Sequence, residues 1–422
     1  MRVLADLTET KLIRALQSSH RDWRLRDARA RQVAIGREGG LVWTGGESTN
    51  IIFPLVAART AEETITRALH RIGGSHVHCE LGPACTPRDL KARLLGYGFT
   101  LPTHGLAGMA CELRDVGAIK MGPAELRVEA ESDFSRMQDH RHPFYRGTEW
   151  QDVAIAMARC RPQRVWHFLA WLGDLPVGSA SLLLSAGVAG IYGVGVLAEY
   201  RRQGIGAEVT AAACRFAADA GFEAAVLTSS PKGQSPYTRV GFRQLCRVEA
   251  CDLSPEAQQQ DPLSNQDREL FVHVCAGRLA RARLLLDTHP QKIHLQNQSG
   301  VGLLDAAAYM HRAHMAEWLF ERGATTNPVT AYDLGWGDRI AAMARTDPDV
   351  ISRRVGGLSP LHIAILRRDT GQITGMALVR ILVECGADLS AIDDEHRSTP
   401  LGWAQAFDDE EAIEFLTGIG AA

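Results

Sequence analysis

The sequence has no long apolar run, no paired-cysteine motif and little excess charge, and each absence narrows its possible functions. No stretch approaches the roughly 20 apolar residues of a membrane span. The charged residues that follow Met1 leave no apolar core for a signal peptide. The nine cysteines form no Cys-x-x-Cys pair and are odd in number, which favours buried thiols in a reducing compartment over disulfides. We therefore expect a cytoplasmic protein.

The weak charge also argues against two classes of partner. A net charge of −3 provides no bulk attraction to nucleic acid or to anionic membranes, so we expect neither as a partner. His76 and His78 alternate onto one face of a predicted strand, but no matching ligand cluster lies nearby in the sequence, so we predict no metal site.

The length of 422 residues and the 45% hydrophobic content are those of ordinary globular domains.

The stretch 191–242 changes its hydrophobic period, which indicates a strand, a turn and a helix. Residues 191–196 form an apolar run typical of a buried strand, whereas from Ile205 the apolar residues recur at helical spacing until Gly221. Residues 201–206 are therefore a strand-to-helix turn, and a second strand is predicted at 224–228.

This turn has the composition of a phosphate-binding site. A helix N-terminus presents unpaired backbone N–H groups, and Gly204 and Gly206 carry no side chain that would keep a phosphate away. Arg201 and Arg202 add positive charge. The spacing is neither that of a P-loop nor that of a dinucleotide-binding turn. We predict that the turn cradles a diphosphate.

The pattern Arg-x-x-Gly-x-Gly at 201–206, followed by a helix, the strand 224–228 and Tyr-x-x-x-Gly-Phe at 237–242, resembles the acetyl-coenzyme A region of the GNAT N-acetyltransferase family. The resemblance implies an α/β GNAT fold, with a mixed central sheet flanked by helices. It also implies an acyltransferase that moves an acetyl group from acetyl-coenzyme A directly to an amine in a ternary complex.

The same resemblance assigns roles to residues by position. Val194 and Val196 would contact the cofactor through their backbones at a strand bulge, with the Val196 N–H as oxyanion donor. Tyr237 would protonate the departing thiolate. Ser230 stands where the family commonly has an Asn that contacts coenzyme A. The residues that would bind the diphosphate are Arg201, Arg202, Gln203, Gly204, Ile205, Gly206 and Ala207.

The sequence does not determine which residues bind the acceptor or what the acceptor is. The resemblance implies an acceptor wall in the loop between two helices, where His140, His142 and Tyr145 are candidates. Glu149 and Glu199 join the two histidines as possible general bases, and a water relay is an equal alternative. The acceptor itself is either a small amine, such as an antibiotic or a metabolite, or an amine of a protein.

Residues 1–115 carry a weaker copy of the same pattern, which predicts an internal duplication. Gly98-Phe99 followed by a strand at 106–113 repeats Gly241-Phe242 followed by a strand at 245–253. No Arg-x-x-Gly-x-Gly occurs before residue 115. We therefore expect a degenerate GNAT-like domain at 1–115, which shapes the acceptor pocket or packs structurally, and the catalytic domain at 120–253.

Three further local predictions concern this first segment. A Thr-x-x-Glu capping box at residue 60 and a Thr-Pro pair at residue 86 predict the starts of two helices, with a strand at 77–81 between them. The arginine-rich run 21–31 also holds two aspartates, which favours a solvated helix face over a phosphate-binding one.

The C-terminal part of the chain contains internal repeats. Residues 254–266 are polar, contain proline and lack periodicity, which predicts a linker. Gly-Leu-Ser-Pro-Leu-His-Ile-Ala at 357–364 is nearly the opening of an ankyrin repeat, and Thr-Pro-Leu at 399–401 opens another. We predict about five irregular repeats over 267–422, forming an all-α solenoid.

The predicted repeats leave their own role open. They would bind a protein partner, mediate self-association, or pack on the catalytic body. The alternative to an enzyme is a regulatory protein that binds coenzyme A without catalysis and acts through the repeats.

Overall fold

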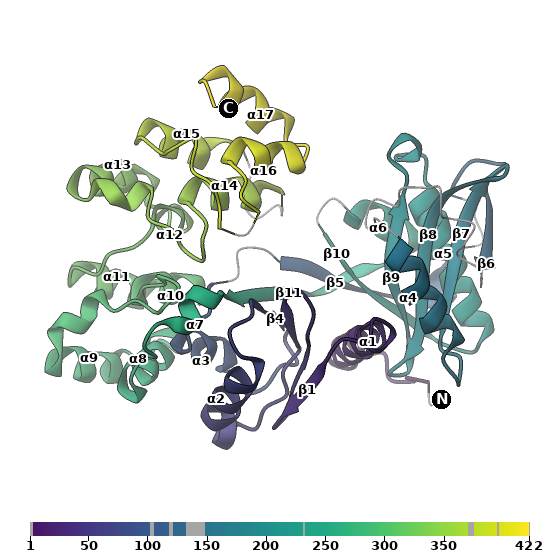
Figure 1. Ribbon diagram of the computed structural model, residues 1–422, viewed down its shortest axis with the longest axis horizontal. Coiled ribbons are helices and arrows are strands. Elements are labelled where there is room, and N and C mark those ends of the chain that lie inside the picture. The colour runs from purple at the N-terminus through teal and green to yellow at the C-terminus, as the bar shows by residue number, and fades with distance from the viewer. Residues whose placement is uncertain are drawn as a thin grey trace.

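The computed structural model describes residues 3–101, 105–117, 121–131, 148–230, 233–369, 375–394 and 396–421. Within these residues, one eleven-stranded sheet occupies the chain up to Leu253, and a stack of helices follows it (Figure 1). The strands are β1 (Ile35–Glu38), β2 (Leu41–Thr44), β3 (Thr49–Ile52), β4 (Val77–Leu81), β5 (Gly105–Glu112), β6 (Arg127–Glu131), β7 (Val165–Leu172), β8 (Leu175–Ser185), β9 (Val188–Val196), β10 (Ala224–Ser229) and β11 (Arg243–Leu253). The helices beside the sheet are α1 (Glu9–Ala30), α2 (Ala61–Ile72), α3 (Leu90–Gly96), α4 (Thr148–Arg159), α5 (Ile205–Asp219) and α6 (Gln234–Val240).

The strand order β1-β2-β3-β4-β11-β5-β10-β9-β8-β7-β6 shows two halves built on one plan. The first half, β1 to β5, has three antiparallel strands, a crossover helix to a parallel strand, a second helix and a last strand. The second half repeats this plan from β7 to β11. The predicted mixed sheet, its flanking helices and the tandem arrangement of its halves are therefore confirmed.

The last strand of each half lies in the other half's part of the sheet. β5 pairs with β10, β11 pairs with β4, and β5 and β11 pair with each other at the centre. Figure 1 shows β5 and β11 crossing the middle of the molecule between the purple first half and the teal second half. The two halves, predicted as domains 1–115 and 120–253, therefore share one sheet in the described residues.

Helix α5 follows the predicted turn and packs on β7, β8 and β9. Its apolar stripe includes Val209, Ala213 and Ala217, which are all fully buried, as the helical spacing predicted. Because the helix is held along its length by this core, its first residue is fixed beside the end of β9.

Two predicted helix caps are wrong in detail. α2 begins at Ala61, but the Thr60 hydroxyl donates to the Ala57 carbonyl at 3.4 Å instead of capping the helix. α3 begins only at Leu90, and the Thr86 hydroxyl donates to the Val56 carbonyl at 3.0 Å instead of capping a helix. The strand predicted between these helices is β4.

The arginine-rich run 21–31 lies on α1, and the prediction of a solvated face is wrong for two of its members. The Arg21 Nε donates to the Ile52 carbonyl at 3.3 Å, and burial lowers the pKa of this guanidinium. The Arg24 Nη2 lies 2.5 Å from the Glu80 Oε1 on β4. Only the tertiary fold brings these partners to the helix.

The rest of the chain is helical. Its helices are α7 (Pro255–Gln259), α8 (Asn265–Cys275), α9 (Leu279–Thr288), α10 (Leu303–Tyr309), α11 (Ala313–Glu321), α12 (Pro328–Asp333), α13 (Gly337–Thr346), α14 (Pro360–Asp369), α15 (Ala377–Glu384), α16 (Pro400–Ala406) and α17 (Glu410–Gly418). In the described residues, α8 to α17 form five helix pairs, as many as the predicted repeats; we call them the helix stack. His362 joins two neighbouring pairs, because its Nε2 lies 3.0 Å from the Ser398 carbonyl.

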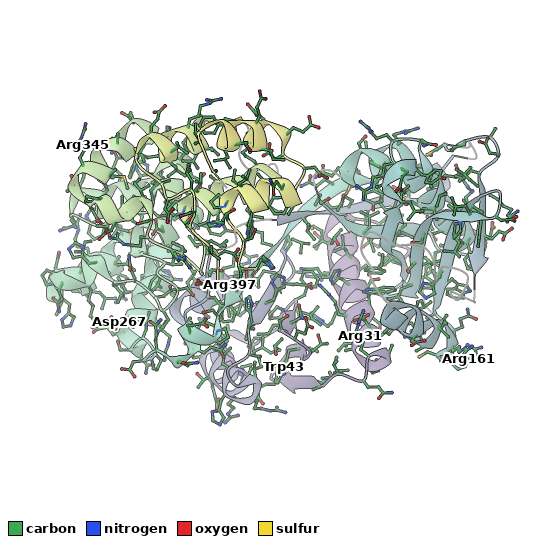
Figure 2. The ribbon with its side chains drawn as sticks, turned by 45° about the horizontal axis from the view of Figure 1, so that its top comes forward. Arg31, Trp43, Arg161, Asp267, Arg345 and Arg397 are labelled. Atoms are coloured by element: carbon green, nitrogen blue, oxygen red, sulfur yellow. The ribbon has the colours of Figure 1, made fainter. Side chains whose placement is uncertain are left out.

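The helix stack and the second half lie at opposite ends of the molecule. In Figure 2, Arg345 of α13 marks one end and Arg161, which follows α4, marks the other. The first half lies between them (Figure 1). No helix in the described ranges has the length and apolarity needed to cross a membrane.

The helix stack is docked firmly on the first half. The Asn297 side chain donates to the Leu95 and Phe99 carbonyls, both at 2.8 Å, and the Ser299 hydroxyl donates to the Gly98 carbonyl at 2.6 Å. The segment 254–266, expected to be a linker, contains α7 and is anchored by Gln258, whose Nε2 donates to the Ser75 carbonyl at 2.6 Å. The stack is therefore fixed to the first half.

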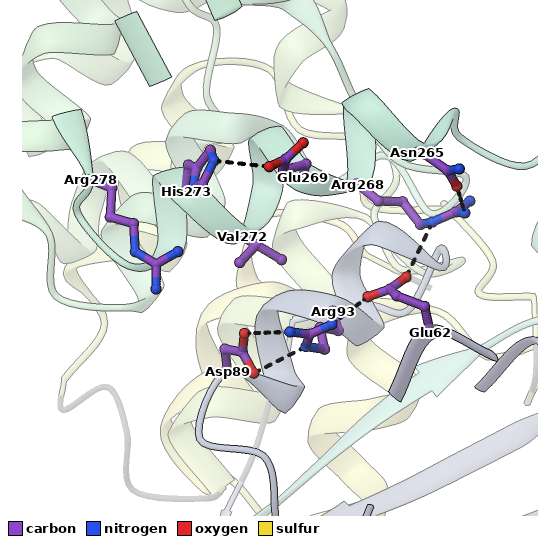
Figure 3. Close-up of a pocket in the computed structure, with 9 residues that line it drawn as sticks. All are labelled: Glu62, Asp89, Arg93, Asn265, Arg268, Glu269, Val272, His273 and Arg278. Atoms are coloured by element: carbon purple, nitrogen blue, oxygen red, sulfur yellow. Dashed lines mark hydrogen bonds and ion pairs between the residues drawn. The ribbon is translucent and has the colours of Figure 1, made fainter. Parts of the chain in front are cut away.

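A charged network closes the outer side of this contact (Figure 3). The Arg93 guanidinium of α3 bonds both Asp89 and Glu62, and Glu62 also lies 3.5 Å from the Arg268 Nε of α8. The cavity between α3 and α8 holds about 510 Å³. Its three arginines face three carboxylates, so its charges balance within the network and strengthen the contact between α3 and α8.

Candidate functional site

Strand β9 bulges and then leaves its neighbour. Across β8, Ser179 faces Gly195 and Ser181 faces Tyr192, so β9 has one residue more than β8 in this interval. This β-bulge includes Gly193, whose φ of +55° is in the left-handed region that favours glycine. β9 pairs with β10 only through Ala189 and Gly190 and then diverges, which opens a slot between the two strands.

The backbone of Val196 points into this slot. The Leu197 N–H donates to the Val177 carbonyl of β8 at 3.0 Å. Because N–H groups alternate sides along an antiparallel strand, the Val196 N–H and carbonyl point away from β8. The Arg201 Nε donates to this carbonyl at 3.3 Å, on the same side. The Val196 N–H, predicted as oxyanion donor, therefore faces the side of β9 that lies away from β8.

Glycine occurs at two positions of the turn 201–206, and the structural reason for it differs between them. Gly204 has a φ of +82°, and a Cβ there would lie 2.0 Å from the Met121 carbonyl oxygen, so turn geometry and packing both require glycine. A Cβ on Gly206 would meet only the Val196 Cγ2, at an ordinary 3.5 Å. Gly206 is thus the glycine whose missing side chain keeps the start of α5 open.

The other turn residues divide between surface and core. Arg201, Arg202 and Gln203 are exposed beside the start of α5, and Arg202 has a φ of +63°. The Ile205 and Ala207 side chains are buried, so these two residues present only their backbone N–H groups to a ligand. The turn therefore offers backbone donors with two guanidiniums near them.

Tyr237 and Ser230 lie near the other edge of the slot. Tyr237 is on α6, with its ring edge toward Phe242 at 6.1 Å between centroids, and burial raises the pKa of its phenol to about 12. The Ser230 Oγ accepts the Gly233 N–H at 3.3 Å, so it stabilises the turn before α6. This use of the hydroxyl reduces what it can offer to a coenzyme.

One cavity of about 580 Å³ brings three of the predicted site residues together: Val194, Ser230 and Tyr237 all line it. We call it the transfer cavity. Among the described residues, Val196 and the turn 201–207 are not part of its lining. The predicted acceptor residues His140, His142 and Tyr145 fall outside the residues that the structure describes.

The opposite wall of the transfer cavity comes from the first half and was missed by sequence reasoning. His20 and Arg24 of α1 line it together with Glu80 of β4. The Glu80 carboxylate lies 3.1 Å from the His20 Nε2 and 2.5 Å from the Arg24 Nη2. Burial opposes ionisation of Glu80, but these two partners outweigh it and hold its pKa well below its usual range.

A sequence signal for this wall exists but is incomplete. His20 and Arg24 are four residues apart, which puts them on one face of a predicted helix. Nothing in the sequence links that face to Glu80, which joins it through the fold. Tyr192, beside the bulge, packs on the same helix: its ring stacks on Trp23 at 4.4 Å, and its hydroxyl lies 2.9 Å from the Ser19 hydroxyl.

His76, just before β4, and His78 within β4 face a carboxylate. The His78 Nδ1 lies 2.8 Å from the Asp252 Oδ1, and the His76 Nε2 lies 3.5 Å from the same oxygen. Burial opposes protonation of His78, but the bond to Asp252 outweighs it and raises the pKa of His78. In the described part of the chain, no three or more His, Cys, Asp or Glu side chains are grouped to hold a metal ion.

Comparison with solved structures finds acetyltransferases of low sequence identity. A GCN5-related N-acetyltransferase from Kribbella flavida is 20% identical with a TM-score of 0.40, over 56% of this chain and 95% of that one. One from Sphaerobacter thermophilus is 16% identical with a TM-score of 0.36, over 51% and 77%. A tandem GNAT protein from the clavulanic acid biosynthesis pathway is 12% identical with a TM-score of 0.40, over 60% and 97%.

Sequence comparison identifies two segments. No curated protein sequence matches the chain. Residues 123–242 match the model of the acetyltransferase (GNAT) family, and residues 356–394 match that of the ankyrin repeat. The first segment contains the bulged strand, the glycine turn and Tyr237. The chain thus contains an acetyltransferase domain of the GNAT family, followed by an ankyrin repeat.

Proposed function

We propose that this protein is an N-acetyltransferase that moves the acetyl group of acetyl-coenzyme A directly to an amine in a ternary complex. The observation that carries the proposal is the slot between β9 and β10, which opens at a bulge into a cavity lined by Val194 and Tyr237. A family match alone would not require these features to share one cavity.

The donor would bind along β9 and at the start of α5. The backbone N–H groups of residues 204–207 and the guanidiniums of Arg201 and Arg202 would hold the diphosphate. The backbone of Val194 and Val196 would hold the pantetheine, which reaches the transfer cavity along the slot. The thioester carbonyl would then lie at the Val196 N–H.

The acetyl transfer itself needs one new bond and one broken bond. The neutral amine attacks the thioester carbon, and the Val196 N–H stabilises the oxyanion that forms. The C–S bond then breaks, the thiolate leaves with the electron pair, and the amine loses its extra proton. The acetylated amine and free coenzyme A are the products.

Tyr237 would stabilise the departing sulfur. Its phenol has a pKa of about 12, whereas a thiol has one of about 8.5. Complete proton transfer from Tyr237 to the thiolate would therefore be uphill by roughly 5 kcal/mol. The supported role is a hydrogen bond from the phenol to the developing thiolate, while the proton released by the amine finally neutralises the sulfur.

The amine's proton would leave through the wall supplied by the first half. His20 of α1 and Glu249 of β11, which pairs with the first half, line the transfer cavity there and can accept a proton, directly or through water, whereas the lowered pKa of Glu80 makes it a weak base. The first half would thus shape the acceptor side of the site, while the second half holds the donor.

The test is turnover of acetyl-coenzyme A by the full chain against a panel of amines: a linear polyamine, an amino sugar and a lysine peptide. Release of free thiol that depends on one of these amines supports the proposal. Coenzyme A binding by calorimetry without thiol release on any amine would instead support the non-catalytic alternative. Absence of coenzyme A binding would overturn both.

A further inference from the structure

A second cavity, of about 660 Å³, lies between the first half and the helix stack. We call it the stack cavity. Asn50, His78 and Asp252 line it from the sheet, and Asp394 and Trp403 line it from the stack. Its volume is in the range of small-molecule sites, about 300 to 1,000 Å³.

The stack cavity is preformed by close backbone packing. The Gly356 N–H donates to the Ser299 carbonyl at 3.3 Å, and a Cβ on Gly356 would lie 2.5 Å from the Thr100 Cγ2 of the first half. Asn297 and Ser299 hold the same region through buried hydrogen bonds. The two walls therefore keep their separation without a ligand.

The stack cavity adjoins the transfer cavity. Arg24 and His78 line both. On β4, His78 and Glu80 point to one face because they are two residues apart, so the same strand face continues from one cavity to the other. A molecule that fills the stack cavity can therefore extend toward Tyr237.

The lining of the stack cavity favours a cation. Three carboxylates, Asp252, Glu256 and Asp394, line it with one guanidinium, that of Arg24, which is bound to Glu80. Three histidines, His76, His78 and His396, also line it, and the first two contact Asp252. Arg354 pairs with Asp394, so Glu256 carries the negative charge that a bound ammonium group would meet.

Two aromatic side chains also favour binding of a cation in the stack cavity. Trp403 and Phe407 of the helix stack also line the cavity. Aromatic faces attract ammonium groups and cover the methylene segments between them. The combination suits a chain of amines separated by short alkyl spacers better than a phosphate or a carboxylate.

We propose that the stack cavity binds the tail of an elongated polyamine acceptor, whose terminal amine reaches the transfer cavity. This inference rests on the proposed acetyltransferase function and names its acceptor class. It also gives the helix stack a direct role, since α16 and the loop that follows Ser352 form one wall of the acceptor site.

The test compares a linear tetra-amine, spermine, with a short monoamine, butylamine, in the full chain. Glu256→Gln with Asp394→Asn removes two negative charges from the stack cavity. With spermine we expect KM to rise about 10-fold at unchanged kcat, because each exposed charge contact contributes modestly. Butylamine kinetics should not change, since this amine is too short to reach the stack cavity.

Two further variants test whether the effect on spermine is specific to the stack cavity. Glu317→Gln removes a charge from α11 outside the cavity and should leave spermine kinetics unchanged. Ser48→Phe fills the mouth of the cavity from the first half and should weaken spermine alone. Melting temperatures within about 3 °C of the parent protein would establish that the variants fold.

Spermine binding measured by calorimetry separates this inference from the proposed function. Spermine binding that weakens in the charge variant supports the stack cavity even if no amine is acetylated. Acetylation of butylamine together with spermine binding that ignores both cavity variants would overturn the acceptor path and leave the acetyltransferase proposal intact. Equal effects on spermine and butylamine would also overturn it.

Discussion

The two glycines of the turn allow a sharp test of the diphosphate cradle. Gly206 is the position to change, because a Cβ there meets only the Val196 Cγ2 at 3.5 Å, whereas one on Gly204 would collide with the Met121 carbonyl. We compare Gly206→Asp with Gly206→Ala as its matched control. Both fit the structure, but only the aspartate brings negative charge to the cradle.

Stability and affinity should move in opposite directions in the aspartate variant. Gly206 lies in the first turn of α5, where replacing glycine gains helix propensity and an acidic group is favoured by the dipole. The free energy of unfolding of both variants should therefore be about 0.5 to 1 kcal/mol higher than that of the parent chain. A folding defect would thus not explain a loss of binding.

The loss of affinity can be estimated from electrostatics. A carboxylate about 5 Å from one phosphate charge, at an effective dielectric constant of about 20 to 40, costs about 2 to 3 kcal/mol. The Kd for coenzyme A should therefore rise about 30- to 150-fold in Gly206→Asp, and by less than about 3-fold in Gly206→Ala. The aspartate penalty should shrink in high salt.

Titration calorimetry with coenzyme A, at low and high salt, measures these values directly. Pantetheine serves as a second ligand, because it lacks the diphosphate and should bind both variants equally. If Gly206→Asp bound coenzyme A as tightly as Gly206→Ala, the diphosphate would lie elsewhere and the cradle assignment would be refuted.

Three further predictions concern the rest of the chain. Tyr237→Phe should lower kcat about 100-fold while the Kd for coenzyme A stays within about 2-fold; an unchanged kcat would remove the phenol from the mechanism. Glu80→Gln should destabilise the protein at pH 7 by about 3 kcal/mol, because it leaves Arg24 without its buried carboxylate. Since the pKa of Glu80 is lowered on folding, its contribution is present above about pH 4.5 and is lost as the pH falls below it, so melting curves of the two proteins should converge in acid; a constant gap would contradict the charge assignment. Asn297→Ala removes the side-chain donor of the buried Phe99 carbonyl and one of two donors to the Leu95 carbonyl, which keeps the Gly98 N–H, and should cost about 2 to 3 kcal/mol, seen as an earlier, separate unfolding transition of the helix stack in calorimetry; a single unshifted transition would show that the contact is not stabilising.

Much of the donor side could be predicted from local sequence. The strand at 191–196, the turn at 201–206 and helix α5 follow from periodicity and glycine placement, since each depends on residues close in sequence. The family resemblance also implied a bulge in this strand, which the structure shows at Gly193. The reason given for Gly204 was incomplete, because its contact with Met121 joins segments distant in sequence.

The acceptor side could not be predicted in the same way. His20, Arg24 and Glu80 come from an N-terminal helix and a strand, and the Arg-rich run was wrongly expected to be solvated at Arg21 and Arg24. When a side chain pairs with a partner more than about 50 residues away, the pairing produces no periodic pattern in the sequence. Burial of Glu80 and its pairing depend on how α1 crosses the sheet.

By itself, the sequence determined the types of element, the ankyrin repeat and the glycine turn before α5, because these depend on spacing within a few helical turns or strand residues. The tertiary structure alone decided that the halves exchange their last strands, that the helix stack is docked on the first half, and that the two cavities adjoin at Arg24 and His78. Those features arise from contacts between distant segments, which local physical chemistry permits but does not select.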